Sequence, residues 1–416
     1  VLPSAFRLPP SSLTSPGDTP MPNFLPQARE LFSYTQSMRR DFHMHPELGF
    51  REIRTGGIVA KELESLGIEV TKGIGKTGVV GLLEGAKPGP TLLLRFDMDA
   101  LPITEDTGAE YASQTEGIMH ACGHDGHTAI GLTVAKILHT HRDQLAGTIK
   151  FCFQPSEEGT NGEEKGGAET MVLDGVLDQP KVDMTLSLHL WNDKPLGWVH
   201  VAKGPVMAGA EHFRIKLIGK GGHGASPHTT VDPVIAAVQI VNAAQSIVAR
   251  NVDPLATAVI SFTMFHSGTT FNVIPQEAAL EGTIRSFDAG IRQRVLERFE
   301  QIVRGVASAM GCQVEMNVKR LTPALVNADD VTASVQGTAR RVLPDADHDD
   351  TPYLTMGAED MAFMQEKVPG CYFFVGSAND ARGLNYGHHH PKFDFDEEAL
   401  VRGAALMASA AADLLK

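Results

Sequence analysis

The 416-residue sequence is poor in cysteine and in positive charge, and it lacks a long uninterrupted apolar run. Four Cys residues in a chain this long do not form a disulfide framework, so we expect a reducing, cytoplasmic location. Lys and Arg number 36 against 50 Asp and Glu, and the net charge of −14 argues against nucleic acid as a partner. The apolar stretch at 233–249 contains Gln, Asn and Ser residues, so we expect no membrane span.

The composition is otherwise that of a globular protein, with 42% hydrophobic and 21% charged residues. At about 150 residues per domain, the length predicts two or three domains. The first twenty residues are rich in Pro, Ser and Thr but lack the apolar core of a signal peptide. We therefore expect a disordered leader over residues 1–26, with Met21 as a natural start.

Residues 27–209 have the pattern of an α/β domain. Apolar runs at 78–83 and 91–96 flank a turn that contains Gly and Pro, which predicts a β-hairpin. Further strands are expected at 148–153, 184–188 and 371–375, and helices at 58–66 and 127–141. This alternation predicts an α/β fold with a mostly parallel sheet and helices on both faces.

Between residues 210 and 320 the order of elements changes. The pattern predicts strands and helices in the order βαββαβ, at 213–218, 233–248, 257–266, 278–287, 290–310 and 312–319. This order is that of a split ferredoxin-like fold. We interpret it as a separate domain inserted into the α/β domain, which resumes over residues 321–416.

The chemistry-bearing residues gather mainly at the expected ends of strands. In chain order they are Asp97 and Asp99, the segment CGHDGH at 122–127, Glu157 and Glu158, His189, and the triplet His388 to His390. In open α/β sheets, ligands bind outside the carboxyl ends of the strands. Thiolate, imidazole and carboxylate groups together suit zinc or a neighbouring first-row metal, so the sequence predicts a metal site at this edge.

Each of these groups alone has a simpler interpretation. An Asp-x-Asp after a strand is often a turn or a helix cap, and the pair Glu157–Glu158 alone is typical of a solvated loop. Cys122 alone is typical of a small buried side chain, and the His triplet alone of a surface tract. We favour the metal site because independent clusters converge on one edge of the predicted sheet.

The same segments carry a resemblance to a known family. They are DFHMHPELGF at 41–50, RFDMDALP at 95–102, HACGHDGH at 120–127, QPSEEG at 154–159, GGHGA at 221–225, NVIP at 272–275, GAED at 357–360 and HHP at 389–391. The sequence resembles the aminoacylase, carboxypeptidase and hippurate hydrolase family of dinuclear metallohydrolases. It is most similar to the amidohydrolase subgroup, which includes N-acyl-amino-acid hydrolases and plant auxin-conjugate hydrolases.

The resemblance implies two divalent metal ions per subunit, Zn²⁺ or Mn²⁺, with Co²⁺ or Ni²⁺ as further candidates. The implied ligands are Cys122, His124, Glu158, His189 and His389. In the wider family an Asp bridges the metals and a His-x-Asp motif opens the site, whereas this sequence has Cys122 and Arg95-Phe96-Asp97 there, as the subgroup does. A bridging thiolate is a softer ligand than a carboxylate, so the identity of the metal stays open. We expect Asp97 to orient a ligand.

The two adjacent glutamates are predicted to have different roles. Neighbouring residues of an extended segment point apart, so Glu158 can bind metal while Glu157 faces the water as general base and later protonates the leaving amine. The alternative, with Glu157 as the ligand and Glu158 exposed, stays open at this point.

Three residues of the inserted domain are predicted to act on the substrate. His223, in a Gly-rich turn, is implied to stabilise the oxyanion and to bind substrate. Asn272 and Arg285 are predicted to bind substrate, Arg285 through an α-carboxylate. The simpler interpretations are a loop His without a role and an exposed strand Arg.

The resulting prediction is a metal-dependent amidohydrolase that cleaves N-acyl or N-aroyl amino acids to a carboxylic acid and a free amino acid. The alternative within the same superfamily is a dipeptidase, aminopeptidase or carboxypeptidase. A metal-binding protein without turnover is disfavoured because a pure binding site needs no general base. The resemblance also implies a homodimer through the inserted domain, with His223 reaching the partner's metal site.

Overall fold

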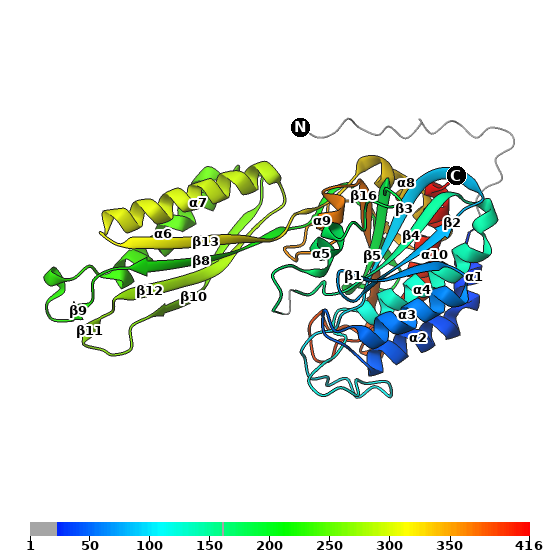
Figure 1. Cartoon of the computed structure of the whole chain (residues 1–416), viewed down its shortest axis with the longest axis horizontal. Coiled ribbons are helices and arrows are strands. Elements are labelled where there is room, and N and C mark those ends of the chain that lie inside the picture. Colours follow the sequence, from blue (N-terminus) through cyan, green and yellow to red (C-terminus); the bar gives the residue numbers. More distant parts are fainter. Residues whose placement is uncertain (1–22, 160–161) are drawn as a thin grey trace. The chain divides into compact units, whose positions relative to one another are not determined.

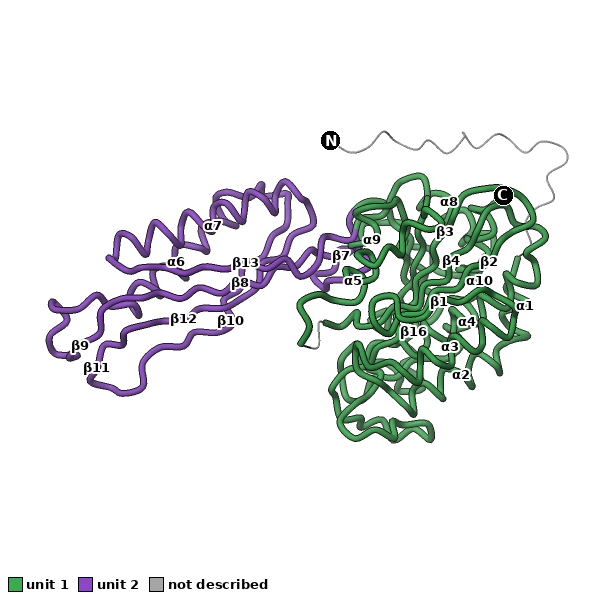
Figure 2. Tube along the Cα trace, viewed as in Figure 1, with its two compact units in different colours: residues 1–204, 326–353, 363–416 green, residues 205–325, 354–362 purple. Residues whose placement is uncertain are grey.

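The computed structural model describes residues 23–159 and 162–416 and divides into two compact units (Figure 2). Of the described residues, unit 1 comprises 23–159, 162–204, 326–353 and 363–416, and unit 2 comprises 205–325 and 354–362. Each unit has a hydrophobic core of its own.

The beginning of unit 1 corrects the predicted leader, of which residues 1–22 lie outside the described chain. Phe24 is fully buried, its ring centroid lies 4.9 Å from that of His141, and its backbone N–H donates to Ser409 Oγ at 3.3 Å. Helix α1 (Leu25–Glu30) starts directly after it, with a Pro in the first turn where the missing N–H breaks no helical hydrogen bond. The predicted boundary at residue 26 is therefore wrong, because burial of Phe24 already ties residues 23–26 to the core.

Within the described residues, unit 1 contains an eight-stranded sheet of order β1-β2-β4-β3-β5-β16-β6-β15 (Figure 1). Neighbouring strands β4, β3, β5 and β16 are parallel, which confirms the predicted mostly parallel sheet. The predicted hairpin is wrong, because β4 lies between β2 and β3 and pairs with both. The strands are β1 (Glu69–Ile74), β2 (Gly78–Glu84), β3 (Lys87–Asp97), β4 (Ala146–Gln154), β5 (Met184–Pro195), β6 (Trp198–His200), β15 (Asp347–Asp349) and β16 (Gly370–Ala378).

Helices pack on both faces of this sheet, as predicted. A Cβ at Gly131 of α4 (His124–Thr140) would lie 2.8 Å from the ring of Phe153, whereas Cys152 Sγ lies 3.8 Å from Met171 Sδ of α5 (Gly167–Leu173). Because successive strand residues point to opposite faces, α4 and α5 lie on opposite sides of β4. Further helices of the unit are α2 (Phe32–Met44), α3 (Ile53–Ser65), α8 (Asp329–Val342) and α10 (Glu398–Leu414); α9 (Ala362–Gln365) begins at the last residue of unit 2.

Unit 2 has the predicted βαββαβ order. Its four-stranded antiparallel sheet has the order β10-β12-β8-β13, which is the ferredoxin-like arrangement. Asp232 and Asp288 cap the two helices by accepting hydrogen bonds from backbone N–H groups of their first turns. The elements are β8 (Gly209–Ile218), β9 (Gly222–His223), α6 (Pro233–Asn251), β10 (Ala258–Ser267), β11 (Val273–Ile274), β12 (Glu277–Ser286), α7 (Ala289–Ala309) and β13 (Gln313–Thr322).

Helix α6 is long and apolar enough to cross a membrane when judged by length and composition alone. In the structure its apolar side has another explanation. Ala236, Ala237, Ile240, Ala244 and Ile247 are fully buried in the core that α6 shares with α7 and the sheet of unit 2. This packing agrees with the sequence expectation that the stretch is not a membrane span.

The boundaries of unit 2 differ from the predicted domain at 210–320. The short strands β7 (Gly204–Met207) and β14 (Leu325–Asn327) span the two chain boundaries. Residues 354–362, predicted to belong to the second part of the catalytic domain at 321–416, cluster instead with unit 2. The cause is backbone pairing, since the N–H of Ala208 donates to the carbonyls of Thr355 and Gly357 at 3.1 and 3.0 Å.

Candidate metal centre

The predicted ligand segments of unit 1 meet at the carboxyl ends of its parallel strands. Asp97 is the last residue of β3, Glu157 and Glu158 follow β4, His189 lies within β5, and His389 follows β16. Cys122 lies just before α4 and His124 is the first residue of that helix, and the intervening Gly123 adopts a left-handed φ of 92° that turns the chain into the helix. The sheet topology therefore brings together residues as distant in sequence as 97 and 389.

Cys122 belongs to two separate groups of ligand-type residues. It forms one group with His124 and His189 and another with Glu158 and His389, and within each group the potential ligand atoms lie within 4.8 Å of one another. Cys122 is the residue that the two groups share. All five predicted metal ligands are thus close together in the structure, in two overlapping sets.

The imidazoles of these groups are oriented by hydrogen bonds from their other ring nitrogen. His124 Nδ1 donates to the Asp99 carbonyl at 2.9 Å, and His189 Nδ1 donates to the Leu190 carbonyl at 2.7 Å. Their Nε2 lone pairs are therefore available for a metal. Among the described residues, the buried His124 Nε2 has no hydrogen-bond partner. An orphaned ring nitrogen in a buried site fits a bound cation.

The electrostatics of the site also favour cations. Burial lowers the pKa of His124, but the carboxylates of Asp97, Asp99 and Glu158 outweigh it and raise that pKa to about 10. Burial, followed by Glu158 and Glu157, raises the pKa of the Cys122 thiol well above its usual value. Burial lowers the pKa of His189, which keeps this ring neutral. The carboxylates that raise the pKa of His124 supply a negative charge that also suits divalent metal ions.

The turn that contains Glu157 and Glu158 is held by two buried carboxylates whose contacts with this turn were not predicted from the sequence. Asp99 accepts a hydrogen bond from each glutamate's backbone N–H at 3.0 Å. Glu52 accepts one from the N–H of Ser156 at 2.9 Å, and Ser156 has a strained left-handed φ of 50°. Burial raises the pKa of Glu52 to about 7. These contacts fix the backbone positions from which the two glutamate side chains extend.

Asp97 has the contacts of an orienting residue. Its carboxylate accepts from His127 Nδ1 at 2.6 Å and from Arg95 Nη1 at 2.6 Å. His127 Nε2 in turn accepts from the backbone N–H of Leu190 at 2.9 Å, next to His189. Asp97 also lies in a group of possible ligand atoms with His124 and His127, so its predicted orienting role stays a prediction.

Arg39 is a further organising residue that the sequence reasoning missed. Its fully buried guanidinium pairs with Asp125 at 2.8 Å, Asp394 at 2.7 Å and Glu397 at 3.3 Å. Asp125 directly follows His124, and Asp394 lies five residues after His389, so Arg39 connects two ligand-bearing segments. A single Arg in α2 carries no sequence signal for contacts this distant.

The three predicted substrate residues lie in unit 2, in two separate places. His223 of β9 is exposed and pairs with Val273 of β11, which places it beside Asn272. Arg285 lies on β12 eight residues beyond Glu277, which is about 27 Å along the strand from this end of the sheet. Burial lowers the pKa of the half-buried Arg285. Within unit 2, the structure brings His223 and Asn272 together but keeps Arg285 apart.

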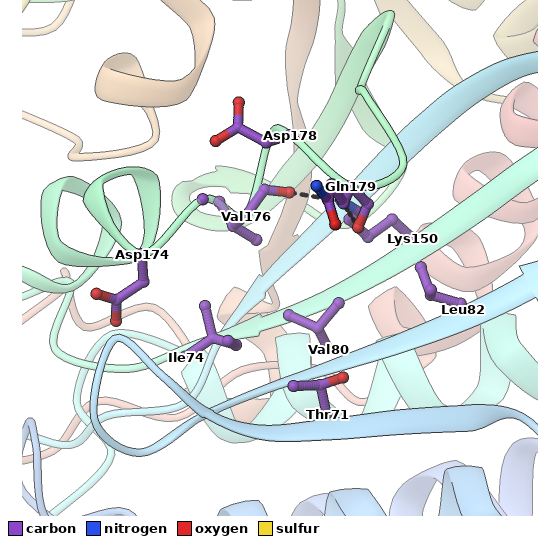
Figure 3. Close-up of a pocket in the computed structure, with 10 residues that line it drawn as sticks. Thr71, Ile74, Val80, Leu82, Lys150, Asp174, Val176, Asp178 and Gln179 are labelled. Carbon is purple, nitrogen blue, oxygen red and sulfur yellow. Dashed lines mark hydrogen bonds between the residues drawn. The ribbon is translucent and has the colours of Figure 1, made fainter.

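A separate cavity of about 370 Å³ opens beside β1, β2, β4 and the turn after α5 (Figure 3). Its buried cation, Lys150, donates to the carbonyls of Val176, Gln179 and Pro180 at 2.7, 3.2 and 3.0 Å. All three donors of the ammonium group are used, so this lysine stabilises the turn. The cavity is lined by none of the predicted metal ligands.

The chain has an α/β unit that carries two overlapping groups of possible metal ligands, and a ferredoxin-like unit is inserted into it. This combination is typical of the class of dinuclear metallohydrolases. Residues 93–413 match the model of Peptidase family M20/M25/M40, and the chain belongs to this family. The resemblance found in the sequence is thereby confirmed.

Individual relatives cover most of the chain. An N-acyl-L-amino acid amidohydrolase of Geobacillus stearothermophilus is 44% identical over 293 residues, covering 70% of this chain and 77% of its own. Thermostable carboxypeptidase 1 of Saccharolobus solfataricus is 40% identical over 378 residues, covering 90% and 94%. The crystal structure of YXEP from Bacillus subtilis, described as a dinuclear metal binding peptidase from the M20 family, is 34% identical, with a TM-score of 0.81 and coverage of 93% and 99%.

Proposed function

We propose that this chain is a metal-dependent amidohydrolase that cleaves N-acyl or N-aroyl amino acids to a carboxylic acid and a free amino acid. The observation that carries the proposal is Cys122, shared by two ligand groups beside the Glu157–Glu158 turn. The relative from Geobacillus stearothermophilus, named for this reaction, supports the substrate class.

The proposed metal centre holds two divalent ions, Zn²⁺ or Mn²⁺, with Co²⁺ or Ni²⁺ as alternatives. Cys122, His124 and His189 would hold one ion, and Cys122, Glu158 and His389 would hold the other, as the two groups of possible ligand atoms suggest. When bound, the two cations lower the pKa of a water molecule toward about 7 and polarise the scissile carbonyl. His389 is 53% exposed, so this side of the centre is open to solvent and substrate.

Glu157 is proposed as the general base, with Glu158 as the ligand. Glu158 Oε1 lies 3.2 Å from His389 Nε2 and 3.9 Å from His124 Nε2, between the two ligand groups. The carboxylate of Glu157 is grouped with two of the proposed ligands, His124 and Glu158, but belongs to neither of the groups that contain Cys122. Glu157 takes a proton from the attacking water and delivers it to the leaving amine nitrogen, while His223 donates a hydrogen bond to the oxyanion.

The substrate's α-carboxylate separates the proposed reaction from its alternative, a dipeptidase, aminopeptidase or carboxypeptidase. The 40% identity with a carboxypeptidase keeps that alternative open. Arg285 is proposed to hold the carboxylate, because a guanidinium binds a carboxylate through two parallel hydrogen bonds. Asn272, which lies beside His223 and apart from Arg285 in unit 2, is proposed to bind another part of the substrate.

A parallel substrate assay tests the proposed function. Metal-loaded protein is incubated with N-acetyl amino acids, hippurate and unblocked dipeptides, and free amino acids are measured by mass spectrometry. We expect higher kcat/KM for the N-acyl or N-aroyl compounds. An N-acyl amino acid amide, which lacks the carboxylate, is the matched control and should react poorly. Faster hydrolysis of dipeptides than of every N-acyl compound would favour the alternative.

We also propose a homodimer through unit 2 and a cytoplasmic location. Apolar side chains are exposed near one end of the sheet of unit 2, on and beside the edge strand β10: Met264, Phe265, Phe271 and Val273. Exposed apolar clusters of this kind are typical of protein contacts. The four cysteines are free and buried, which supports a reducing compartment.

A further inference from the structure

The sulfur of Cys122 is contacted by two imidazoles, of which the proposed metal chemistry uses only one. His189 Nε2 lies 3.5 Å from Cys122 Sγ, and His388 Nδ1 lies 3.8 Å from it. His189 is a proposed ligand. His388 precedes the ligand His389 and belongs to neither metal-binding group.

The two rings have opposite tautomers, as assigned from their hydrogen bonds. His189 donates its Nδ1–H to the Leu190 carbonyl, so its Nε2 carries a lone pair. His388 Nε2 accepts a hydrogen bond from the backbone N–H of Asn192 at 3.2 Å, so its proton is on Nδ1. The nitrogen of His388 that faces Cys122 is therefore a donor, whereas that of His189 is an acceptor.

The position of His388 is fixed from several sides. Its ring centroid lies 4.9 Å from that of Trp191 and 5.1 Å from that of Phe393. The side chain of Asn192 donates to the carbonyls of Tyr386 and Asp394, which holds the backbone N–H that orients the ring. His389 has a left-handed φ of 65°, a strained conformation at the residue that follows.

A hydrogen-bond donor that faces this sulfur also acts on any metal ion that the sulfur binds. Hydrogen bonds to a metal-bound sulfur withdraw electron density from it and tune the metal.

We propose that His388 is a positioning residue for the metal centre, whose Nδ1–H donates a hydrogen bond to the bridging thiolate of Cys122 and reduces electron donation from sulfur to the metals. The inference rests on the proposed function in one respect, the bridging role of Cys122. It is independent of the acyl group that the enzyme prefers.

Cobalt substitution of the full-length protein tests this role without relying on activity. Stripped protein is loaded with Co²⁺, and the sulfur-to-cobalt charge-transfer absorption is recorded at matched cobalt content. His388→Phe keeps an aromatic ring but lacks the donor, so we expect the band to shift to lower energy. His388→Asn places an amide N–H near the position of Nδ1, so the wild-type band energy should be restored.

Two further variants control for general effects on the loop. His388→Gln extends its amide toward the position of Nε2 and should behave like His388→Phe. His390 stacks on Tyr386 at 4.6 Å, and its Nδ1 accepts from the backbone N–H of Lys392, so His390→Gln should leave the band unchanged. If His388→Phe does not fold, the comparison of the Asn and Gln variants decides.

Equal band energies in the wild type, His388→Gln and His388→Asn would overturn the proposal. A shift of the same size in His388→Asn and His388→Gln would also overturn it, because the donor would then have no special role. The absence of any sulfur-to-cobalt band in the wild type is a different result. It would contradict the proposed ligand Cys122.

Discussion

Glu157→Gln is expected to lower kcat by about a hundred- to ten-thousand-fold while metal content and fold stay unchanged, because general acid–base catalysis is worth this much. Gln cannot take a proton from water, yet it has nearly the shape of Glu. The backbone N–H of residue 157 still donates to Asp99, so the turn that positions residue 158 is preserved. The measurement combines kcat with metal analysis of the purified variant.

Glu158→Gln is the matched control, because it is the adjacent residue with the same substitution. Its backbone N–H also donates to Asp99, but its carboxylate is a member of the group with Cys122 and His389. We expect this variant to bind less metal, and its loss of activity to be partly reversed by excess metal. Near-normal turnover in Glu157→Gln would require the two roles to be exchanged or abandoned.

His223→Ala is expected to lower kcat by about a hundred- to a thousand-fold, the typical effect of losing one oxyanion donor. His223 is exposed in unit 2 and its Nδ1 accepts from the backbone N–H of Ala225, which leaves Nε2 to act as the donor. If His223 acts in the partner's site, His223→Ala and Glu157→Gln chains should complement each other. After dissociation and re-mixing, half of the dimers carry one working site, giving about a quarter of wild-type activity.

The complementation needs evidence that subunits have exchanged. Differently tagged chains recovered as a mixed dimer provide it, and each variant re-mixed with itself is the control. A mixed dimer without activity would show that His223 acts within its own chain or has no catalytic role.

The sequence predicted the elements that carry strong periodicity and the residues that carry chemistry. The βαββαβ order of unit 2 and the parallel centre of unit 1 followed from apolar patterning. Cys, His and Glu residues near strand ends indicated a metal site, and the five proposed ligands were implied by the family resemblance that these segments carry. Which strands pair with each other was harder to predict, as the wrong hairpin shows. A turn between β2 and β3 does not reveal that β4, which comes later in the chain, lies between them.

The supporting contacts of the site were not predictable from local sequence. Arg39 reaches Asp394 across 355 positions in the chain, and Glu52 reaches Ser156 across 104. The tautomers of His189 and His388 depend on which backbone groups of β5 face each ring. Such contacts are set by tertiary packing, which spacing in the sequence does not encode.

Metal removal and stepwise reconstitution test the central claim, a two-metal centre that performs amide hydrolysis, most directly. Chelator-stripped protein is titrated with Zn²⁺, Mn²⁺ or Co²⁺ while hydrolysis of an N-acyl amino acid and labelling of Cys122 by a thiol reagent are followed. We predict negligible hydrolysis without metal, full rate at about two ions per chain, and slower labelling as the thiolate becomes metal-bound. Full activity in thoroughly stripped protein, with Cys122 labelled equally fast in both states, would contradict the account.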